Sequence, residues 1–259
     1  MDLNTIEQVT DAADAGAWRP GDGWLAGGTY LFSEPQPHLK RLRDLTAYRW
    51  PALTDGPEGL QIAATCTIAE LREYPNELFA QCCDAFLASF KIQHVATVGG
   101  NVCAALPAGP MTSLTAALDG WCTLEGPDGV RRRVAVTDFV TGEGTTMLEP
   151  GEFLRSIFLP ASALGGRTAF RQGSLHPLGR SAALVIGRVA DGGLVLTVTA
   201  STKRPVQLRF AHLPTPAELG TALEGAIPDD LWVDDVHGKP SWRRHLTRMF
   251  AEQVCGELR

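Results

Sequence analysis

The sequence lacks the cysteine patterns of a metal or iron–sulfur site. It contains six cysteines in 259 residues, but none forms a C-x-x-C pair and none has a histidine at the spacing of zinc ligands. We therefore expect no metal in this chain, and we interpret most cysteines as small buried apolar residues. They are Cys66, Cys82, Cys83, Cys103, Cys122 and Cys255.

An excess of positive charge and a long apolar run are also missing. Lys and Arg number 23 against 29 Asp and Glu, a formal net charge of −6, which argues against a nucleic-acid partner. No run approaches the roughly 20 apolar residues of a membrane span, and the first residues, MDLNTIEQVT, do not read as a signal peptide. We expect a cytoplasmic protein with no membrane span.

Two glycine doublets are the strongest positive signal. The first lies in Ala26–Thr29 (AGGT) and the second in Thr97–Asn101 (TVGGN). Glycine allows positive φ and close approach of the backbone to a ligand, so that N–H groups and short side-chain donors can reach anionic oxygens. Either doublet alone could be an ordinary turn. Together they suggest one extended ligand that carries a pyrophosphate.

Apolar periodicity and turn residues predict a mixed succession of helices and strands. Thr67 followed by Glu70 is typical of a helix N-terminus, and the glycines of 164–166 mark a linker. Expected helices cover 5–15, 67–75, 76–87, 111–118, 216–226 and 242–258, and expected strands cover 24–26, 60–65, 121–125, 130–136, 152–159, 168–172, 181–189 and 194–201. We expect one domain over 1–163, with subdomains of about 1–50 and 51–163, and a second over 167–259.

Four segments in order resemble the FAD-binding (medium) subunits of the molybdenum hydroxylases, the family of xanthine dehydrogenase and aerobic carbon monoxide dehydrogenase. Leu25–Thr29 (LAGGT) is similar to the first FAD loop and Val95–Asn101 (VATVGGN) to the second. The stretch 138–160 resembles the segment that closes the flavin domain, and Ala169–Ser174 (AFRQGS) the strand that opens the C-terminal domain. Trp242–Leu246 (WRRHL) is similar to the last helix.

The resemblance implies an α+β fold of the vanillyl-alcohol-oxidase type, in which two α/β subdomains hold FAD non-covalently, followed by a C-terminal α+β domain. It implies no catalytic side chain in this chain. Leu154 and Arg171 are expected near the flavin ring, although Arg171 could equally be a surface strand arginine. The expected FAD contacts are Leu25, Ala26, Gly27, Gly28, Thr29, Tyr30, Leu31, Thr97, Gly99, Gly100, Asn101, Leu106, Leu154 and Arg171.

The chain departs from the family pattern at several of these positions. Tyr30 stands where the family usually has Asp, Leu106 where it has Ser, and Pro110 where it has a second Asp. Proline offers neither an N–H donor nor a side-chain acceptor. Tyr30 could instead stack on flavin or adenine, whereas we expect His94 neither to link covalently to the flavin nor to tune it.

The function implied is electron transfer. FAD would take electrons from [2Fe–2S] clusters in a small partner subunit, while a large subunit with molybdopterin oxidises the substrate, and would pass them to NAD⁺, oxygen or another acceptor. Two alternatives stay open. One is a cofactor-free scaffold subunit of such a complex, and the other is a self-sufficient flavin oxidoreductase, such as a relative of the UDP-N-acetylenolpyruvylglucosamine reductases. The sequence leaves the substrate and the terminal acceptor open.

Overall fold

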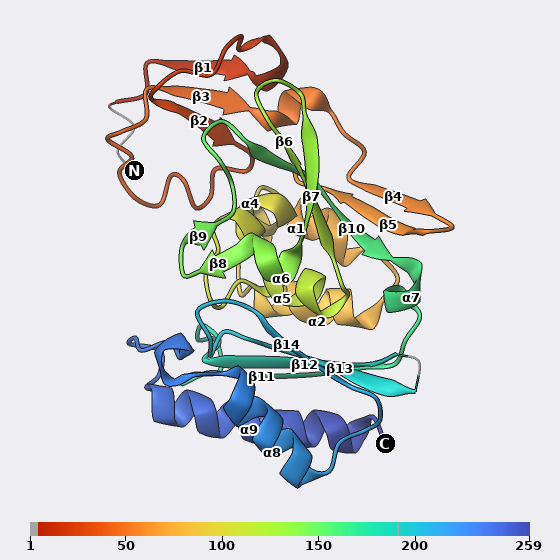
Figure 1. Cartoon of the computed structure of the whole chain (residues 1–259). Coiled ribbons are helices and arrows are strands. Elements are labelled where there is room, and N and C mark those ends of the chain that lie inside the picture. The colour runs from red at the N-terminus through yellow and green to blue at the C-terminus, as the bar shows by residue number, and fades with distance from the viewer. Residues whose placement is uncertain (1–4, 191) are drawn as a thin grey trace.

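The computed structural model describes residues 5–190 and 192–259, which form three main sheets stacked along the long direction of the molecule (Figure 1). The first sheet is parallel, in the order β1-β3-β2. Its strands are β1 (Gln8–Asp11), β2 (Asp22–Leu25) and β3 (Arg41–Asp44), with short 3₁₀ helices η1 (Ala12–Asp14) and η2 (Leu45–Tyr48) after β1 and β3.

The helix predicted over 5–15 is wrong, because this segment pairs with β3 instead. Val9 lies opposite Leu42, and β1 forms an edge of the sheet. Its partner strand lies far along the chain, so the apolar spacing of 5–15 alone did not reveal the pairing. The strand predicted at 24–26 is confirmed as β2, which ends immediately before the first glycine doublet.

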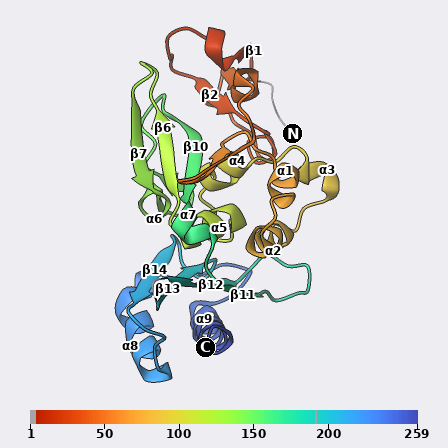
Figure 2. The same cartoon turned by 90° about the vertical axis from the view of Figure 1, so that its right-hand side faces the viewer.

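The second sheet is antiparallel, in the order β4-β5-β10-β6-β7. The apolar strand β10 lies at its centre, and helices lie on one side of the sheet (Figure 2). The strands are β4 (Leu53–Gly56), β5 (Gly59–Ala63), β6 (Trp121–Glu125), β7 (Arg131–Ala135) and β10 (Phe153–Pro160). The helices are α1 (Ile68–Arg72), α2 (Glu77–Ala85), α3 (Phe90–Gln93), α4 (Val98–Cys103) and α5 (Pro110–Ala117).

Smaller elements follow β7 and β10, and the last of them leads to the third sheet. They are α6 (Val136–Phe139), β8 (Val140–Gly142), β9 (Thr145–Thr146) and α7 (Ala161–Leu164). The capping box of Thr67 and Glu70 at the start of α1 is confirmed. The linker expected at 164–166 lies between α7 and β11 (Thr168–Gly173), where the third sheet begins.

The third sheet is antiparallel, in the order β11-β12-β13-β14, with α8 and α9 below it (Figure 1). Leu184 and Ile186 of β12 join the core under α5, whereas Val185 packs toward α9. The other elements are β12 (Ala183–Ala190), β13 (Gly193–Thr199), β14 (Val206–Phe210), α8 (Pro216–Ala226), η3 (Asp229–Leu231) and α9 (Pro240–Glu257). The turn expected at 191–193 lies partly outside the described residues.

Hydrogen bonds tie the third sheet to the second layer. The Ala200 N–H donates to the Pro107 carbonyl at 2.8 Å, and the buried hydroxyls of Ser113 and Thr199 are 2.7 Å apart. The loop before α5 is therefore held against the end of β13.

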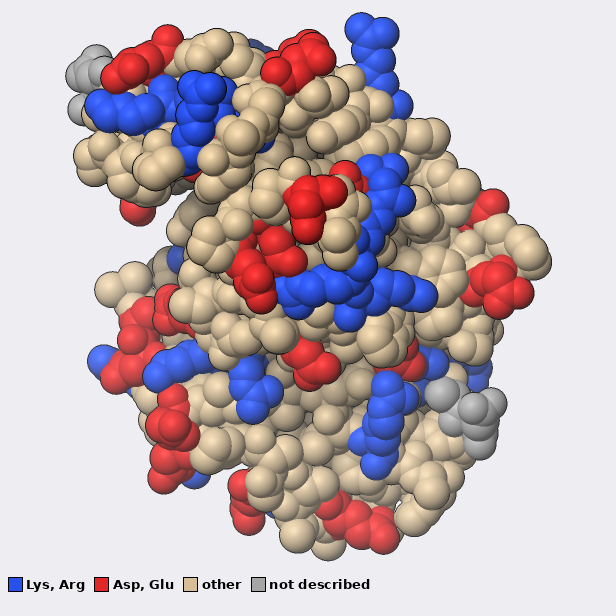
Figure 3. All heavy atoms as spheres, turned by 45° about the horizontal axis from the view of Figure 1, so that its top comes forward, with Lys and Arg blue, Asp and Glu red and all other residues tan. Residues whose placement is uncertain are grey.

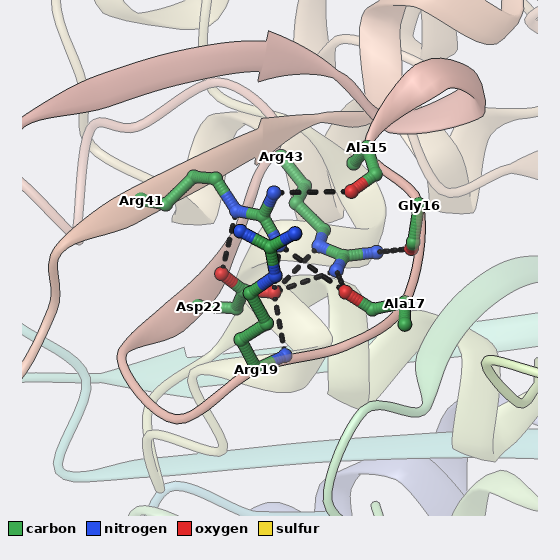
Figure 4. Close-up of polar contacts among 7 residues, drawn as sticks. All are labelled: Ala15, Gly16, Ala17, Arg19, Asp22, Arg41 and Arg43. Carbon is green, nitrogen blue, oxygen red and sulfur yellow. Dashed lines mark hydrogen bonds and ion pairs between the residues drawn. The ribbon is translucent and has the colours of Figure 1, made fainter.

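A buried ion cluster fixes β2 against β3 (Figure 4). The Asp22 carboxylate, 2% exposed, accepts two hydrogen bonds at 2.7 Å from Arg41, and the Arg43 guanidinium lies 2.6 Å away. The hydrogen bond from Arg41, with a backbone N–H and Arg43 adding to it, holds the pKa of Asp22 well below its usual range. Arg43 also lies over the ring of Trp24. The cluster thus supports the strand that leads into the first glycine doublet.

Candidate functional site

A pocket of about 710 Å³ lies between the first sheet and the helices of the second layer. Figure 3 shows the surface hollowed below the lobe of the first sheet, with basic and acidic residues interspersed around it. The volume suits a cofactor-sized ligand. The predicted contacts that line it are Ala26, Gly27, Gly28, Thr29, Tyr30, Leu31, Thr97, Gly99, Gly100, Asn101, Leu106 and Leu154.

The first glycine doublet presents unpaired backbone donors to this pocket. Within the described residues, the N–H groups of 27–31 have no hydrogen-bond acceptor. Gly28 has φ +69°, after which the chain turns so that the Phe32 N–H donates to the Gly28 carbonyl at 2.8 Å. Successive N–H groups around a left-handed residue form a concave anion site. The first glycine doublet therefore has the backbone geometry of an anion site.

Through Gly27, the first doublet is in direct contact with the segment that leads into the second doublet. A Cβ at this position would lie 1.9 Å from the carbonyl oxygen of Val95, so only glycine fits without backbone movement. Gly28 is also close to its surroundings, because a Cβ there would lie 2.5 Å from the ring of Phe32. The pocket floor is thus built by close approach of two segments that are distant in sequence.

The second doublet is not a free loop but the first turn of α4. Thr97 caps the helix by accepting from the Gly100 N–H at 3.0 Å. The Val98 N–H donates to Cys66, and the Gly99 N–H to Ala64. The prediction that these N–H groups are aimed at a phosphate is therefore wrong, because protein acceptors already hold them. Here glycine permits packing, since a Cβ on Gly99 would lie 2.5 Å from Ala64.

Asn101 links the pocket to α5. Its side-chain oxygen accepts from the Met111 N–H at 3.1 Å, which leaves the Asn101 amide nitrogen without an acceptor in the described residues. Pro110 is the first residue of α5, where a missing N–H costs nothing. The proline at the family's aspartate position is thus explained as a helix start, and it does not line the pocket.

Apolar side chains line much of the remaining wall. Trp24 packs against Phe153 with ring centroids 4.7 Å apart, and its indole N–H is buried without an acceptor in the described residues. Leu148 and Leu154 continue the apolar surface. Cys103 also lines the pocket, and burial raises the pKa of its thiol to about 12, so the thiol is protonated at neutral pH.

Two predicted contacts lie outside the pocket lining. Leu25 packs behind the loop, against the position where a Gly28 side chain would be. Arg171 lies on β11 and pairs with Glu257 of α9 at 2.7 Å. Its neighbour Phe170 packs toward the second-layer core, and successive residues of a strand face opposite sides. The expectation that Arg171 lies beside the ligand does not agree with this structure.

Arg180 is a pocket residue that the sequence analysis missed. It belongs to the loop between β11 and β12, which no motif connected to the glycine doublets. Arg180 reaches the pocket because the third sheet packs beneath the second layer, and no local sequence pattern indicates this packing.

The described residues contain no cluster of three or more metal-ligating side chains. Nor does the described part of the chain contain a helix that is long and apolar enough to cross a membrane. All six cysteines are free thiols, of which five are buried, as predicted.

Comparisons with known proteins agree with this geometry. The family model described as the FAD binding domain in molybdopterin dehydrogenase matches residues 4–162. The chain belongs to this family. The xanthine dehydrogenase FAD-binding subunit of Escherichia coli O157:H7 is 30% identical, over 96% of this chain and 92% of that protein.

The carbon monoxide dehydrogenase medium chain of Afipia carboxidovorans is 29% identical over 53% of this chain and 48% of its own length. The structure of reconstituted CO dehydrogenase from Oligotropha carboxidovorans matches with a TM-score of 0.83 over 99% of this chain and 98% of that one, at 21% identity. The predicted fold and the oxidoreductase family are thereby confirmed.

Proposed function

We propose that the pocket binds FAD non-covalently and that this chain is the FAD-carrying electron-transfer subunit of a molybdenum hydroxylase complex. The observation that carries the proposal is the run of backbone N–H groups at 27–31, which have no acceptor in the described residues and belong to residues that line a pocket of about 710 Å³. Unpaired donors on a glycine turn fit a pyrophosphate, and the chain belongs to an FAD-binding family.

Different residues of the pocket would hold different parts of FAD. The turn 27–31 would bind the pyrophosphate, and the free amide nitrogen of Asn101 would add a donor beside it. Leu106, Leu148 and Leu154 provide the apolar wall that a flavin ring needs and keep water from it. Tyr30 is half exposed at the pocket and could stack on a ring of the cofactor.

Bound FAD supplies reversible electron uptake, and the protein contributes its binding, orientation and electrostatics. We propose that electrons arrive from [2Fe–2S] clusters of a small partner subunit, after a molybdopterin-containing large subunit has oxidised the substrate. The acceptor would be NAD⁺, oxygen or another oxidant. The names of the relatives, a subunit and a medium chain, support such an assembly. The cytoplasmic location is part of this proposal.

The first test is the visible absorption spectrum of the purified chain, alone and coexpressed with the products of neighbouring genes. Oxidised-flavin bands, with FAD released on denaturation, are expected. A chain that stays colourless with added FAD, even in the complex, would instead support the cofactor-free scaffold. Turnover of a substrate by the chain alone would support the self-sufficient oxidoreductase.

A matched pair of glycine variants assigns the cofactor to this pocket. Gly28→Ala should lose most bound FAD, because its Cβ would lie 2.5 Å from Phe32 at a φ of +69°. Gly129→Ala is the control, since Gly129 also has positive φ, +78°, but has no atom within 4 Å of the added Cβ. Equal FAD content in both variants would place the cofactor elsewhere.

A further inference from the structure

Arg180 and Glu34 are the charged residues among those that line the pocket. Glu34 follows the first glycine turn on the N-terminal lobe. Arg180 comes from the third sheet, at the end of the loop that joins β11 to β12. The pocket therefore receives a single positive side chain from its described lining, and this side chain comes from the C-terminal part of the chain.

Buried hydrogen bonds hold the chain next to Arg180 in place. The Arg243 guanidinium, 1% exposed, donates to the carbonyls of Ala182 at 2.7 Å and Ala200 at 2.9 Å. The Ala200 N–H in turn donates to Pro107, next to Leu106. Since Arg180 precedes Ala182 by two residues, this chain of contacts brings the backbone at Arg180 toward Pro107 and Leu106, and both Arg180 and Leu106 line the pocket. The backbone N–H groups of 27–31, which we assign to the pyrophosphate, belong to the N-terminal lobe instead.

The guanidinium of Arg180 has no ion pair or hydrogen bond within the described residues, whereas arginines elsewhere on the same sheet are paired. Arg171 contacts Glu257 at 2.7 Å, and Arg188 contacts Asp119 at 2.5 Å. A guanidinium without a protein partner keeps its capacity to pair with a bound anion. Arg180 is thus both placed in the pocket and available to a ligand there.

We propose that Arg180 faces the flavin ring of bound FAD and stabilises the reduced form of the flavin. This proposal rests on the proposed function above. FAD that takes up two electrons and one proton carries one more negative charge on its ring than oxidised FAD. A nearby fixed cation favours the more negative form. Arg180 therefore raises the reduction potential of the bound flavin, which favours electron acceptance.

The test compares three variants of the full chain loaded with FAD: Arg180→Gln, Arg180→Lys and the control Arg171→Gln. Each is titrated with dithionite beside a reference dye. Arg180→Gln should lower the ratio of reduced to oxidised flavin at a fixed potential by about tenfold, which is about 30 mV for a two-electron couple. Arg180→Lys should recover most of this loss, and Arg171→Gln should leave the ratio unchanged.

Three results would overturn the proposal. An unchanged ratio in Arg180→Gln, with FAD still bound, refutes the role of Arg180 alone. A shift of equal size in Arg171→Gln would show that the effect is not local to the pocket. Failure of the unaltered chain to bind FAD, alone or in its complex, would refute both this role and the proposed function. Thermal unfolding of each variant shows whether the fold is intact.

Discussion

Replacing Gly27 by alanine is the sharpest perturbation of the pocket, because it acts where the two glycine segments touch. The new Cβ would lie 1.9 Å from the carbonyl oxygen of Val95 and 2.8 Å from its carbonyl carbon. Ordinary contact begins near 3.4 Å, so one segment must move by about 1.5 Å. Both atoms belong to the backbone, so no side-chain rotation relieves the overlap.

Overpacking of this kind costs about 1–3 kcal/mol. If the first turn moves away from α4 to relieve it, FAD affinity should fall by roughly 5- to 150-fold. Titration of the apoprotein with FAD, followed by tryptophan or flavin fluorescence, measures this change. Gly165→Ala is the matched control, since Gly165 has φ −90° and no atom within 4 Å of the added Cβ. An unchanged FAD affinity in Gly27→Ala would refute this account of the pocket.

Further predictions concern Asp22 and two residues of the pocket lining, Asn101 and Cys103. Asp22→Asn should lower the free energy of unfolding by about 3–5 kcal/mol, because Arg41 and Arg43 lose a buried counterion. A loss below 1 kcal/mol in urea unfolding would contradict this. Because the pKa of Asp22 is lowered in the folded state, its contribution to stability is present above the unfolded carboxyl pKa of about 3.9 and is lost as the pH falls further. The free energy of unfolding of Asp22→Asn should therefore depend less steeply on pH in the acid range. Asn101→Ala should cost about 0.5–2 kcal/mol through the lost acceptor of Met111, measured by thermal unfolding against Asn101→Asp, which keeps the acceptor. Cys103, with a thiol pKa of about 12, should resist iodoacetamide at pH 8, and rapid labelling seen by mass spectrometry would contradict the raised pKa of this thiol.

Elements with local signals were predicted well from the sequence. The capping box at Thr67 and the bounds of α8 follow from residues within a few positions of each other. The first sheet was predicted poorly, because its pairing is remote in sequence. Strand β3 reads RLRD, and Asp22 of β2 neutralises its buried Arg43 and its partly buried Arg41. A short charged segment gives no such indication by itself.

The candidate site shows the same division. The first glycine turn was identified correctly as a pocket element, since its conformation is local. The roles of Gly99 and Gly100 were not, because the Ala64 carbonyl accepts from the Gly99 N–H and the Thr97 hydroxyl accepts from the Gly100 N–H. Arg171 was expected beside the flavin on resemblance alone, whereas the side that a residue of β11 faces depends on the register of the third sheet. The domain limits at 163 and 167 stay a prediction.

The most direct test of the central claim compares the binding of FAD and riboflavin to the apoprotein by calorimetry. Riboflavin has the flavin ring but no phosphate, so it can use the apolar wall and not the N–H groups of 27–31. Charge-assisted hydrogen bonds contribute about 1.5–3 kcal/mol each. We therefore predict that FAD binds at least about tenfold more tightly than riboflavin. Equal affinities would contradict a pyrophosphate site at the first glycine turn.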